Sequence, residues 1–257
     1  QSGTVRAVSG GNTISGRKSE FLSSFRADQD RAFKAGRGAS ANSGGSNGST
    51  FGPYRSGSIG GDGINGLLTF EAEPSILTQY QSAGLNLPTI NQVDASSNAI
   101  TYNLDMTAAM AGNKFGPQVE IKSAEDLASS SLFRTESGSG FAIKTDGDIV
   151  AVFASSTEPA GGSYAMLQAA VQAGGNKLDA FDTFLPDIYK RVGFRPVARL
   201  PWNDEFAPPG WDKNGVFKKY NNGEPDIIFF VHDSEYFGVA TDVPVAIDYD
   251  DAVRLQN

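Results

Sequence analysis

The sequence predicts an α+β (or α/β) protein with a mixed, mostly antiparallel, twisted sheet flanked by helices. Apolar and polar residues alternate over 131–156 on both sides of Asp146-Gly147, a dipeptide that favours a hairpin turn because both positions tolerate positive φ. The apolar spacing then changes to that of a helix over 164–175. Short segments of the two kinds continue to alternate as far as Asp233, so both a sheet and helices are expected.

Glycine and charge are unevenly distributed along the 257 residues. Residues 1–65 hold 14 of the 30 glycines and eight basic against four acidic residues, a net charge of +4, whereas the rest of the chain carries −12. Residues 36–66 are of low complexity, and such a composition buries too little apolar surface to offset the entropy lost on ordering. Four parts are expected: an extended, basic, Gly/Ser-rich arm (1–66), a connector (67–98), a folded domain (99–235) and an acidic C-terminal tail (236–257).

The composition excludes several classes of site. With no cysteine, the chain has no disulfides, thiolate nucleophiles or cysteine-ligated metals, and its single histidine excludes a histidine-rich metal centre. No stretch of the sequence approaches the ~20 apolar residues of a membrane span. The arm carries only +4 and the acidic body repels nucleic acid. We therefore expect no metal and no membrane contact, and nucleic acid is disfavoured as a partner.

The elements before the hairpin are less clearly marked. Phe21, Leu22 and Phe25 would share one face of a short helix within 19–35, which is either an amphipathic docking helix or a frayed helix in a linker. The other segments are expected as follows: a strand or helix over 67–84, an extended connector over 85–93, a strand over 99–106, a short helix over 107–113, a strand over 118–123, and a helix capped by Ser123.

Strands and helices alternate after the hairpin. Pro186 and Gly193 are typical of the two ends of a helix. Both tryptophans and three prolines fall within 201–212, where they would form one wall of a cleft or a rigid lid over the sheet edge. The expected order is a helix (164–175), a strand (177–184), a helix (185–194), a strand (196–202), an irregular loop (203–225), a buried strand (226–233) and one further strand in VPVAIDY (243–249).

Two segments carry a family resemblance. TEPAGGSYAML (157–167) lies between an expected strand and an expected helix, and LPDIYKRVGF (185–194) places Tyr189 before Gly193-Phe194. Together with the order of the elements, these segments resemble the GNAT acyltransferase superfamily. Over roughly 105–235, the chain resembles phage-encoded GNAT-like modules of virion and polyvalent proteins. The resemblance implies a GNAT-like sheet. A splayed gap between the strands at 148–155 and 177–183 would leave room for a pantetheine arm, whereas a closed sheet filled with side chains would rule it out.

The resemblance also implies a cofactor site. GNAT enzymes transfer an acyl group from acetyl-CoA, and Gly161, Gly162, Ser163 and Tyr164 would hold the diphosphate, because a helix start offers free backbone N–H groups and a favourable dipole. Glu158 departs from the family pattern, because its charge would repel phosphate. In the alternative interpretation, Gly161-Gly162 forms a tight strand-to-helix turn without any ligand.

Candidate catalytic residues follow from the same resemblance. Tyr189 occupies the family's tyrosine position, where it would donate a proton to the leaving thiolate, or else it packs against the sheet. The acceptor amine needs a base because a free ammonium has a pKa near ~10, and Asp179 and Asp182 precede the tyrosine helix. Glu136 and Asp148 are further acidic candidates. No spacing distinguishes these four acids from solvated surface carboxylates or helix caps.

Two functions remain open on the sequence alone. The first is a phage virion-associated structural or assembly protein that carries a GNAT-like domain and is anchored to other virion subunits, in a multimeric assembly, by its N-terminal arm. The second is an active acetyl-CoA-dependent N-acyltransferase with Tyr189 as general acid. The expected location is the phage virion, or otherwise the bacterial cytoplasm. Because the sequence starts with Gln and its first methionine is Met106, the chain is expected to be processed or part of a longer protein.

Overall fold

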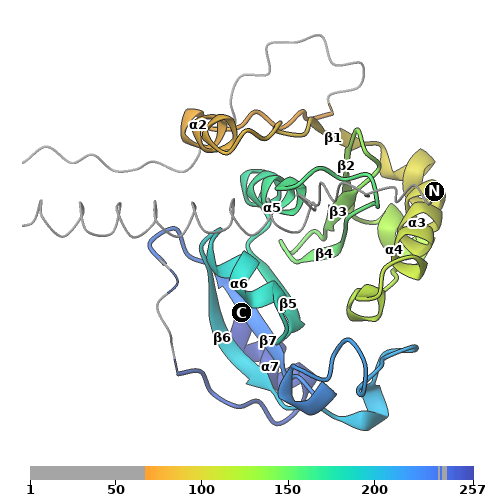
Figure 1. Cartoon of the computed structure of the whole chain (residues 1–257), viewed down its shortest axis with the longest axis vertical. Coiled ribbons are helices and arrows are strands. Elements are labelled where there is room, and N and C mark those ends of the chain that lie inside the picture. The colour runs from red at the N-terminus through yellow and green to blue at the C-terminus, as the bar shows by residue number, and fades with distance from the viewer. Residues whose placement is uncertain (1–66, 237, 239–241) are drawn as a thin grey trace, which may run out of the picture.

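The computed structural model of the chain describes residues 67–236, 238 and 242–257. The predicted arm (1–66), including the predicted helix within 19–35, lies outside these residues. The described part has an α+β architecture of two antiparallel sheets flanked by helices (Figure 1). This agrees with the predicted class. Among the described residues, no helix combines the length and apolar character that crossing a membrane requires.

The first sheet has the strand order β1-β2-β3-β4. Its strands are β1 (Ile90–Val93), β2 (Ser131–Thr135), β3 (Gly140–Ile143) and β4 (Ile149–Phe153), and each neighbouring pair is antiparallel. The predicted turns join the last three strands, with positive φ at Gly138 (85°) and at Gly147 (84°). The hairpin prediction is therefore confirmed. Strand β1 lies inside the segment predicted to be an extended connector, so this segment contributes an edge of the sheet.

The second sheet has the strand order β5-β7-β6. It consists of β5 (Lys177–Phe181), β7 (Ile227–His232) and β6 (Phe194–Leu200), again all antiparallel. Each strand coincides with a predicted one to within a few residues. Side chains alternate across this sheet, so that Phe230 joins the same core as Leu178 while Phe229 packs on the opposite face with Ala252.

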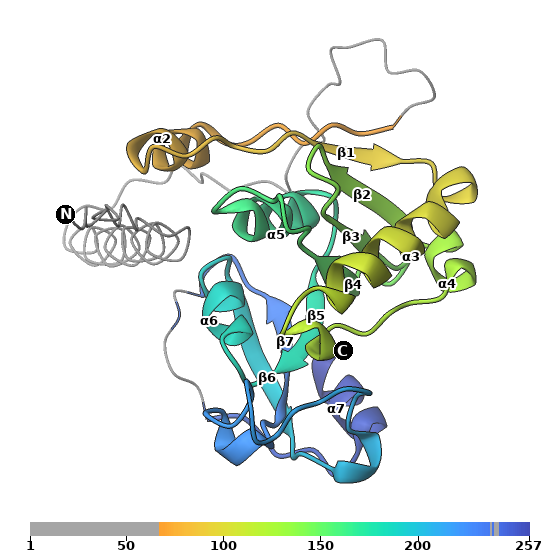
Figure 2. The ribbon, with the colours of Figure 1, turned by 45° about the vertical axis from the view of Figure 1, so that its right-hand side comes forward.

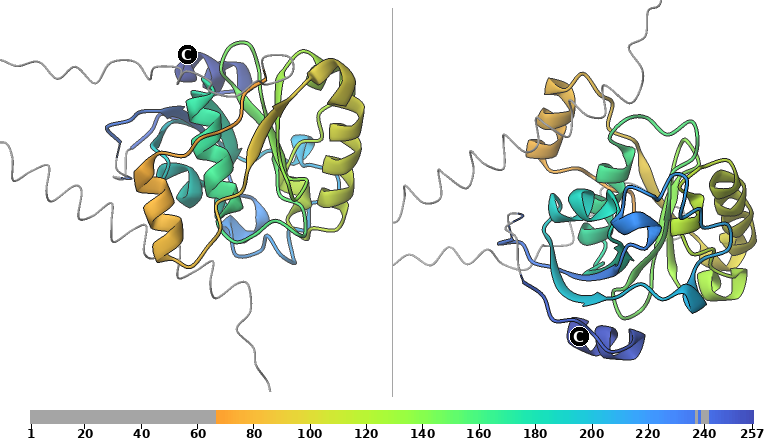
Figure 3. Two further views of the ribbon diagram at one scale, coloured as in Figure 1. Left: turned by 90° about the horizontal axis from the view of Figure 1, so that it is seen from above. Right: turned by 60° about the horizontal axis from the view of Figure 1, so that its bottom comes forward.

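Helices cover both faces of both sheets. Helix α3 (Ala95–Ala111) and α5 (Gly162–Gln172) lie on opposite faces of the first sheet, as the view from above shows (Figure 3). The short α4 (Ala124–Ala128) packs against α3, and α2 (Pro74–Ser82) lies beside α5. On the second sheet, α6 (Leu185–Lys190) and α7 (Tyr249–Gln256) cover opposite faces. The helices predicted over 164–175 and 185–194 are confirmed as α5 and α6.

Two strand predictions before the hairpin are wrong. The segment 99–106 belongs to α3, because the Asp94 carboxylate caps this helix by accepting a hydrogen bond from Ser97 N. The buried residues of α3 recur at helical spacing: Ala99, Tyr102, Met106 and Met110. The helix predicted over 107–113 is the last part of α3. The strand predicted over 118–123 is extended chain after the 3₁₀ turn η1 (Gly116–Gln118), whereas the predicted cap at Ser123 is confirmed by its hydrogen bond from Asp126 N.

The last residues fold back onto the second sheet. The strand predicted in VPVAIDY is reduced to one isolated bridge, between Arg199 and Val245. Helix α7 follows it, and the sequence analysis missed this helix. Its signal was present, because Asp248 accepts a hydrogen bond from Asp251 N and two aspartates occupy the first turn. This part of the predicted acidic tail is therefore a structural element that covers β6 and β7.

Candidate functional site

The two sheets separate from each other between β4 and β5. Asp148 and Lys177 form one parallel bridge there, beside a hydrogen bond from Asn176 N to Gly147 O of 2.9 Å. Beyond this point the two strands pair with different sheets and diverge (Figure 2). A cavity of about 1080 Å³ lies between them. A gap between 148–155 and 177–183 is thus present.

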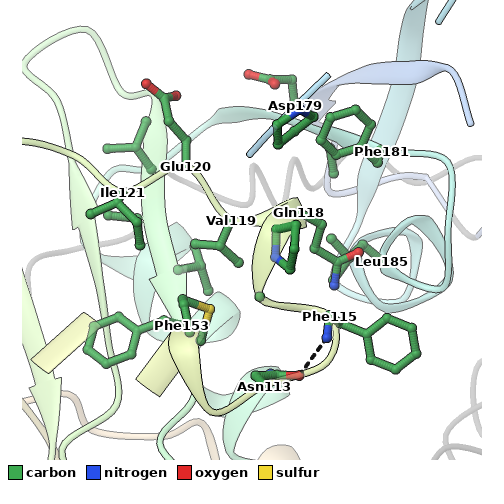
Figure 4. Close-up of a pocket in the computed structure, with 18 of the residues that line it drawn as sticks. Asn113, Phe115, Gln118, Val119, Glu120, Ile121, Phe153, Asp179, Phe181 and Leu185 are labelled. Carbon is green, nitrogen blue, oxygen red and sulfur yellow. Dashed lines mark hydrogen bonds between the residues drawn. The ribbon is translucent and has the colours of Figure 1, made fainter. Parts of the chain in front are cut away.

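The cavity has mostly apolar walls. Strands β4 and β5 form two sides, Met166 and Leu167 of α5 and Leu185 and Ile188 of α6 close the floor, and the segment 113–122 crosses in front. Figure 4 shows the cavity with Phe115, Val119 and Phe153 on its walls and the carboxylates of Glu120 and Asp179 at one end. A long, mostly apolar ligand with polar groups at its ends would fit this space.

Strand β4 has a bulge where it lines the cavity. Its pairing with β3 shifts between Gly140 and Ala142, and Ala151 adopts a positive φ of 52°. The Tyr102 hydroxyl of α3 donates to Ala151 O over 3.0 Å. In a trans peptide, the following N–H points opposite to that carbonyl. The Val152 N–H of the same peptide therefore points away from the Tyr102 hydroxyl. A bulge of this kind re-aims backbone groups.

The four residues predicted to bind a cofactor diphosphate begin α5. Gly161 has a φ of 90°, which a residue with a side chain would rarely adopt, and its carbonyl accepts a 2.6 Å hydrogen bond from the Tyr80 hydroxyl. Ser163 lines the cavity. Gly162 and Tyr164 are buried, and burial raises the pKa of the Tyr164 hydroxyl to about 12.

The side chain of Glu158 lies directly over this helix start. A Cβ at residue 162 would overlap its Oε1 atom, so a larger residue there would displace the Glu158 side chain. Its Oε2 atom accepts hydrogen bonds from Thr135 Oγ1 (2.8 Å) and from Ser137 Oγ. The buried Oε1 atom has no hydrogen-bond partner among the described residues. The Glu158 carboxylate therefore lies beside the start of α5, and its hydrogen bonds come from Thr135 and Ser137 rather than from the backbone N–H groups of the helix.

Tyr189 is placed by α6 in the wall of the cavity. Its side chain is 7% exposed and its ring packs edge-on against Phe194 and Phe230. Burial raises the pKa of the Tyr189 hydroxyl above its usual value, and the charge of Asp179 adds to this effect. The hydroxyl makes no hydrogen bond to any described residue. It is therefore a protonated donor that its protein surroundings leave without a partner.

Asp179 is at the cavity edge of β5. Its surroundings strip water from the carboxylate and raise the pKa of Asp179 to about 6, and the charge of Asp148 raises it further. The Tyr249 hydroxyl of α7 donates to Asp179 Oδ1 over 3.2 Å and opposes this shift. The Asp179 side chain is exposed to the cavity, although the walls of the cavity lie close to it. At neutral pH, Asp179 is an ionised carboxylate with unusually high basicity for an aspartate.

The other acidic candidates lie elsewhere. Asp182 follows the end of β5, where its N–H bonds to Asp226 O at 2.7 Å, and it does not line the cavity. Asp148 is paired with Lys144 at 2.7 Å. Glu136 is exposed in the turn after β2, outside the cavity. The structure thus brings Asp179 and Tyr189 to the same cavity and leaves Asp182 outside it.

The segment 201–212, which carries both tryptophans, packs rigidly on the edge of the second sheet and also borders the cavity. Trp211 stacks on Phe217 with ring centroids 3.7 Å apart, and Trp202 and Phe181 pack beside it, so the tryptophans fix the loop to β5. Pro208 and Pro209 line the cavity, and Phe206, 76% exposed, lies at its rim. The loop therefore supplies one wall of the cleft.

The sequence analysis missed three features of this site. Tyr249 and Glu120 reach the cavity from segments distant from β5 in sequence, and no local pattern marks that proximity. The bulge at Ala151 also has no signal in the sequence, because alanine is not typical of positive φ. Glu158 was recognised as unsuited to phosphate, but its position over Gly162 was not predicted.

Comparisons of the chain with protein-family models, with curated proteins and with solved structures found no match. Within the described ranges, no group of three or more histidine, aspartate or glutamate side chains is arranged to hold a metal ion. The chemistry of the site therefore has to be argued from its own residues.

Proposed function

We propose that the body of this protein is a GNAT-like N-acyltransferase domain that binds an acyl thioester between β4 and β5. The observation that carries this proposal is the divergence of these two strands around a cavity of about 1080 Å³. The apolar walls and the Val152 N–H at the bulge fit the pantetheine arm and the carbonyl of such a thioester. Glu158 does not fit the diphosphate of acetyl-CoA unless its side chain leaves the start of α5.

In this proposal, Asp179 and Tyr189 handle the two protons of the reaction. Acetyl-CoA, or a related thioester, supplies the acyl group. Asp179 accepts a proton from the ammonium of the acceptor, which frees the nitrogen lone pair to attack the thioester carbonyl. The Val152 N–H would stabilise the developing oxyanion. As the C–S bond breaks, the Tyr189 hydroxyl donates its proton to the leaving sulfur and recovers one from the N–H of the collapsing tetrahedral intermediate, so the products are an amide, a thiol and the proton held by Asp179.

The experiment is a thiol-release assay with acetyl-CoA and acetyl-pantetheine over a panel of primary amines. Tyr189→Phe should lower kcat by about 10²–10⁴-fold, the usual contribution of a positioned acid. Tyr220→Phe, outside the cavity, is the matched control and should leave kcat unchanged. If neither thioester binds to the wild-type chain, the proposal is wrong.

Glu158 supports a second function, a structural role in a phage virion. A carboxylate over the start of α5 disfavours an anionic cofactor there. This is what we expect of a domain that does not bind the cofactor and serves as a structural unit. The charge difference between the basic arm and the acidic body also favours contact of the arm with neighbouring acidic subunits in a multimer. Removing residues 1–65 should then abolish incorporation into particles. Normal incorporation of the truncated chain would contradict this function.

A further inference from the structure

We propose that the Asp179 end of the cleft binds an organic ammonium group carried by an apolar or aromatic skeleton, and that it rejects amines with a carboxylate beside the nitrogen. As an acceptor subsite, this inference rests on the proposed acyl transfer. The binding itself does not depend on that reaction and is testable without it.

The first argument is that Asp179 lacks a cation. The lysines around it are already paired within the protein: Lys144 with Asp148 (2.7 Å), Lys122 with Glu120 (2.5 Å) and Lys177 with Asp146 (3.0 Å). Among the described side chains, the one hydrogen bond to Asp179 comes from the neutral Tyr249 hydroxyl. The Asp179 side chain is exposed to the cavity, so a ligand can reach its carboxylate. A ligand ammonium would supply the cation that Asp179 lacks.

The second argument is the unpartnered hydroxyl of Tyr189. This side chain is more than nine-tenths buried and lines the same cavity, and its hydroxyl bonds to no described residue. The hydroxyl oxygen itself keeps access to the cavity, so a ligand or water can supply its partner there. The charge of Asp179 reaches Tyr189 strongly enough to raise its pKa. Both groups therefore line the same cavity and act on each other electrostatically.

The third argument concerns what the ligand must and must not carry. Glu120 and Asp179 lie on opposite walls at the same end of the cavity (Figure 4), and Asp148 acts electrostatically on Asp179 as well. Because Glu120 and Asp148 are each paired with a lysine, a carboxylate on the ligand would be repelled mainly by the charge of Asp179, which has no ion pair among the described residues. The neighbouring rim is apolar, with Phe206 76% and Ile121 41% exposed, and aromatic faces attract ammonium groups. An apolar monoamine supplies the ammonium group, carries no carboxylate and matches the apolar rim.

The test uses the full chain and three probes of similar shape in calorimetric titrations at pH 7.5. Phenethylamine carries the ammonium, phenylalanine adds a carboxylate next to it, and phenethyl alcohol removes the charge. Phenethylamine should bind at least tenfold more tightly than either of the others. Asp179→Asn should lose this preference, Asp179→Glu should retain part of it, and Asp182→Asn, which alters an acid outside the cavity, should bind like the wild type.

The pH dependence gives a further check. The groups that act on Asp179 are Asp148, Glu120, Lys122 and Tyr249. Because the carboxylate must be ionised to bind an ammonium, affinity for phenethylamine should fall as the pH drops through about 6. Equal binding of phenethylamine and phenylalanine, or unchanged binding in Asp179→Asn with normal thermal unfolding, would overturn the inference. Binding without acyl transfer would reject the proposed function alone, whereas transfer to amines with and without carboxylates would reject this inference alone.

Discussion

The two ends of the cleft satisfy their polar groups in different ways. At the α5 end, the Tyr80 hydroxyl bonds to Gly161 O and two hydroxyls hold Glu158 over Gly162. At the β5 end, the Tyr189 hydroxyl has no partner among the described residues, and Asp179 has no cation. The side chains of Tyr80 and Glu158 at the first end do not line the cavity, although Glu158 Oε1 is buried there without a partner among the described residues. By contrast, Asp179 and Tyr189 at the second end line the cavity and are open to a ligand. Four predictions test this difference, from the largest expected effect to the smallest.

The bulge that separates the two ends depends on Gly140. A Cβ at this position would lie 2.6 Å from Phe133 O and 2.8 Å from the Tyr102 ring. Gly140→Ala should therefore lower the free energy of unfolding by about 1–3 kcal/mol, as overpacking typically does. Gly112→Ala at the end of α3, where the nearest atoms are 3.9 Å away, is the control for denaturant unfolding. Equal stability of the two variants would contradict the tight packing behind the bulge.

Two tyrosine substitutions compare the ends directly. Tyr80→Phe removes the hydroxyl donor of the Gly161 carbonyl, which keeps its bonds from Tyr164 N and Ala165 N, and should cost about 0.5–1.5 kcal/mol of stability. Tyr189→Phe removes a hydroxyl that has no described partner, so its change in stability should be close to zero. Urea unfolding of both variants measures the difference. A larger loss for Tyr189→Phe would mean that the protein itself uses this hydroxyl.

Glu158→Gln should open the α5 end to an anion. The substitution keeps the shape of the side chain but removes a charge over the helix start, and such a charge is worth up to ~2 kcal/mol. Binding of coenzyme A should therefore strengthen by up to about 30-fold, whereas binding of pantetheine should not change. Glu136→Gln removes the same charge from an exposed position and serves as control. An equal gain for both ligands would refute a role of Glu158 at the diphosphate position.

Asp179→Asn should have the smallest effect, and this effect should depend on pH. The pKa of Asp179 is raised to about 6 in the fold, so its ionisation costs stability as the pH rises from about 4 through 6. The variant should match the wild type near pH 4 and be more stable at pH 7.5, by less than about 1 kcal/mol because the carboxylate is exposed to the cavity. A variant less stable than the wild type at pH 7.5 would mean that Asp179 supports the fold.

Much of the fold follows from local signals in the sequence. Asp146-Gly147 marks a hairpin, Pro186 and Gly193 bound α6, and the strands of the second sheet are apolar runs between breakers. The error over 99–106 has a physical cause. Ile100 and Thr101 favour a strand locally, but the Asp94 cap and the burial of Tyr102 beneath the first sheet favour a helix.

Less of the site follows from the sequence. The segment 185–194 predicts the helical position of Tyr189, but its free hydroxyl is a result of tertiary packing. The sequence does not distinguish Asp179 from Asp182 as a candidate base. In the structure, Asp179 lies within β5, where side chains alternate between the two faces, whereas Asp182 follows the end of the strand. Tyr249 is 70 residues from Asp179, so their hydrogen bond depends on the packing of α7 against the second sheet, which no local pattern predicts.

The bridge between Asp148 and Lys177 is the point at which the two strands that line the cleft remain in contact, so the angle between the strands is set there. Three glycines sit at this bridge, and two leave no space: a Cβ at Gly175 would lie 2.5 Å from the Ile149 side chain, and one at Gly147 would lie 2.5 Å from Asn176. Gly174, with a φ of 98°, turns the chain beside them. A side chain added at Gly147 or Gly175 would push β4 and β5 apart close to this bridge. A displacement of a few tenths of an ångström there increases the separation of β4 and β5 progressively along the two strands. The glycines at the bridge therefore set the width of the open end of the cleft.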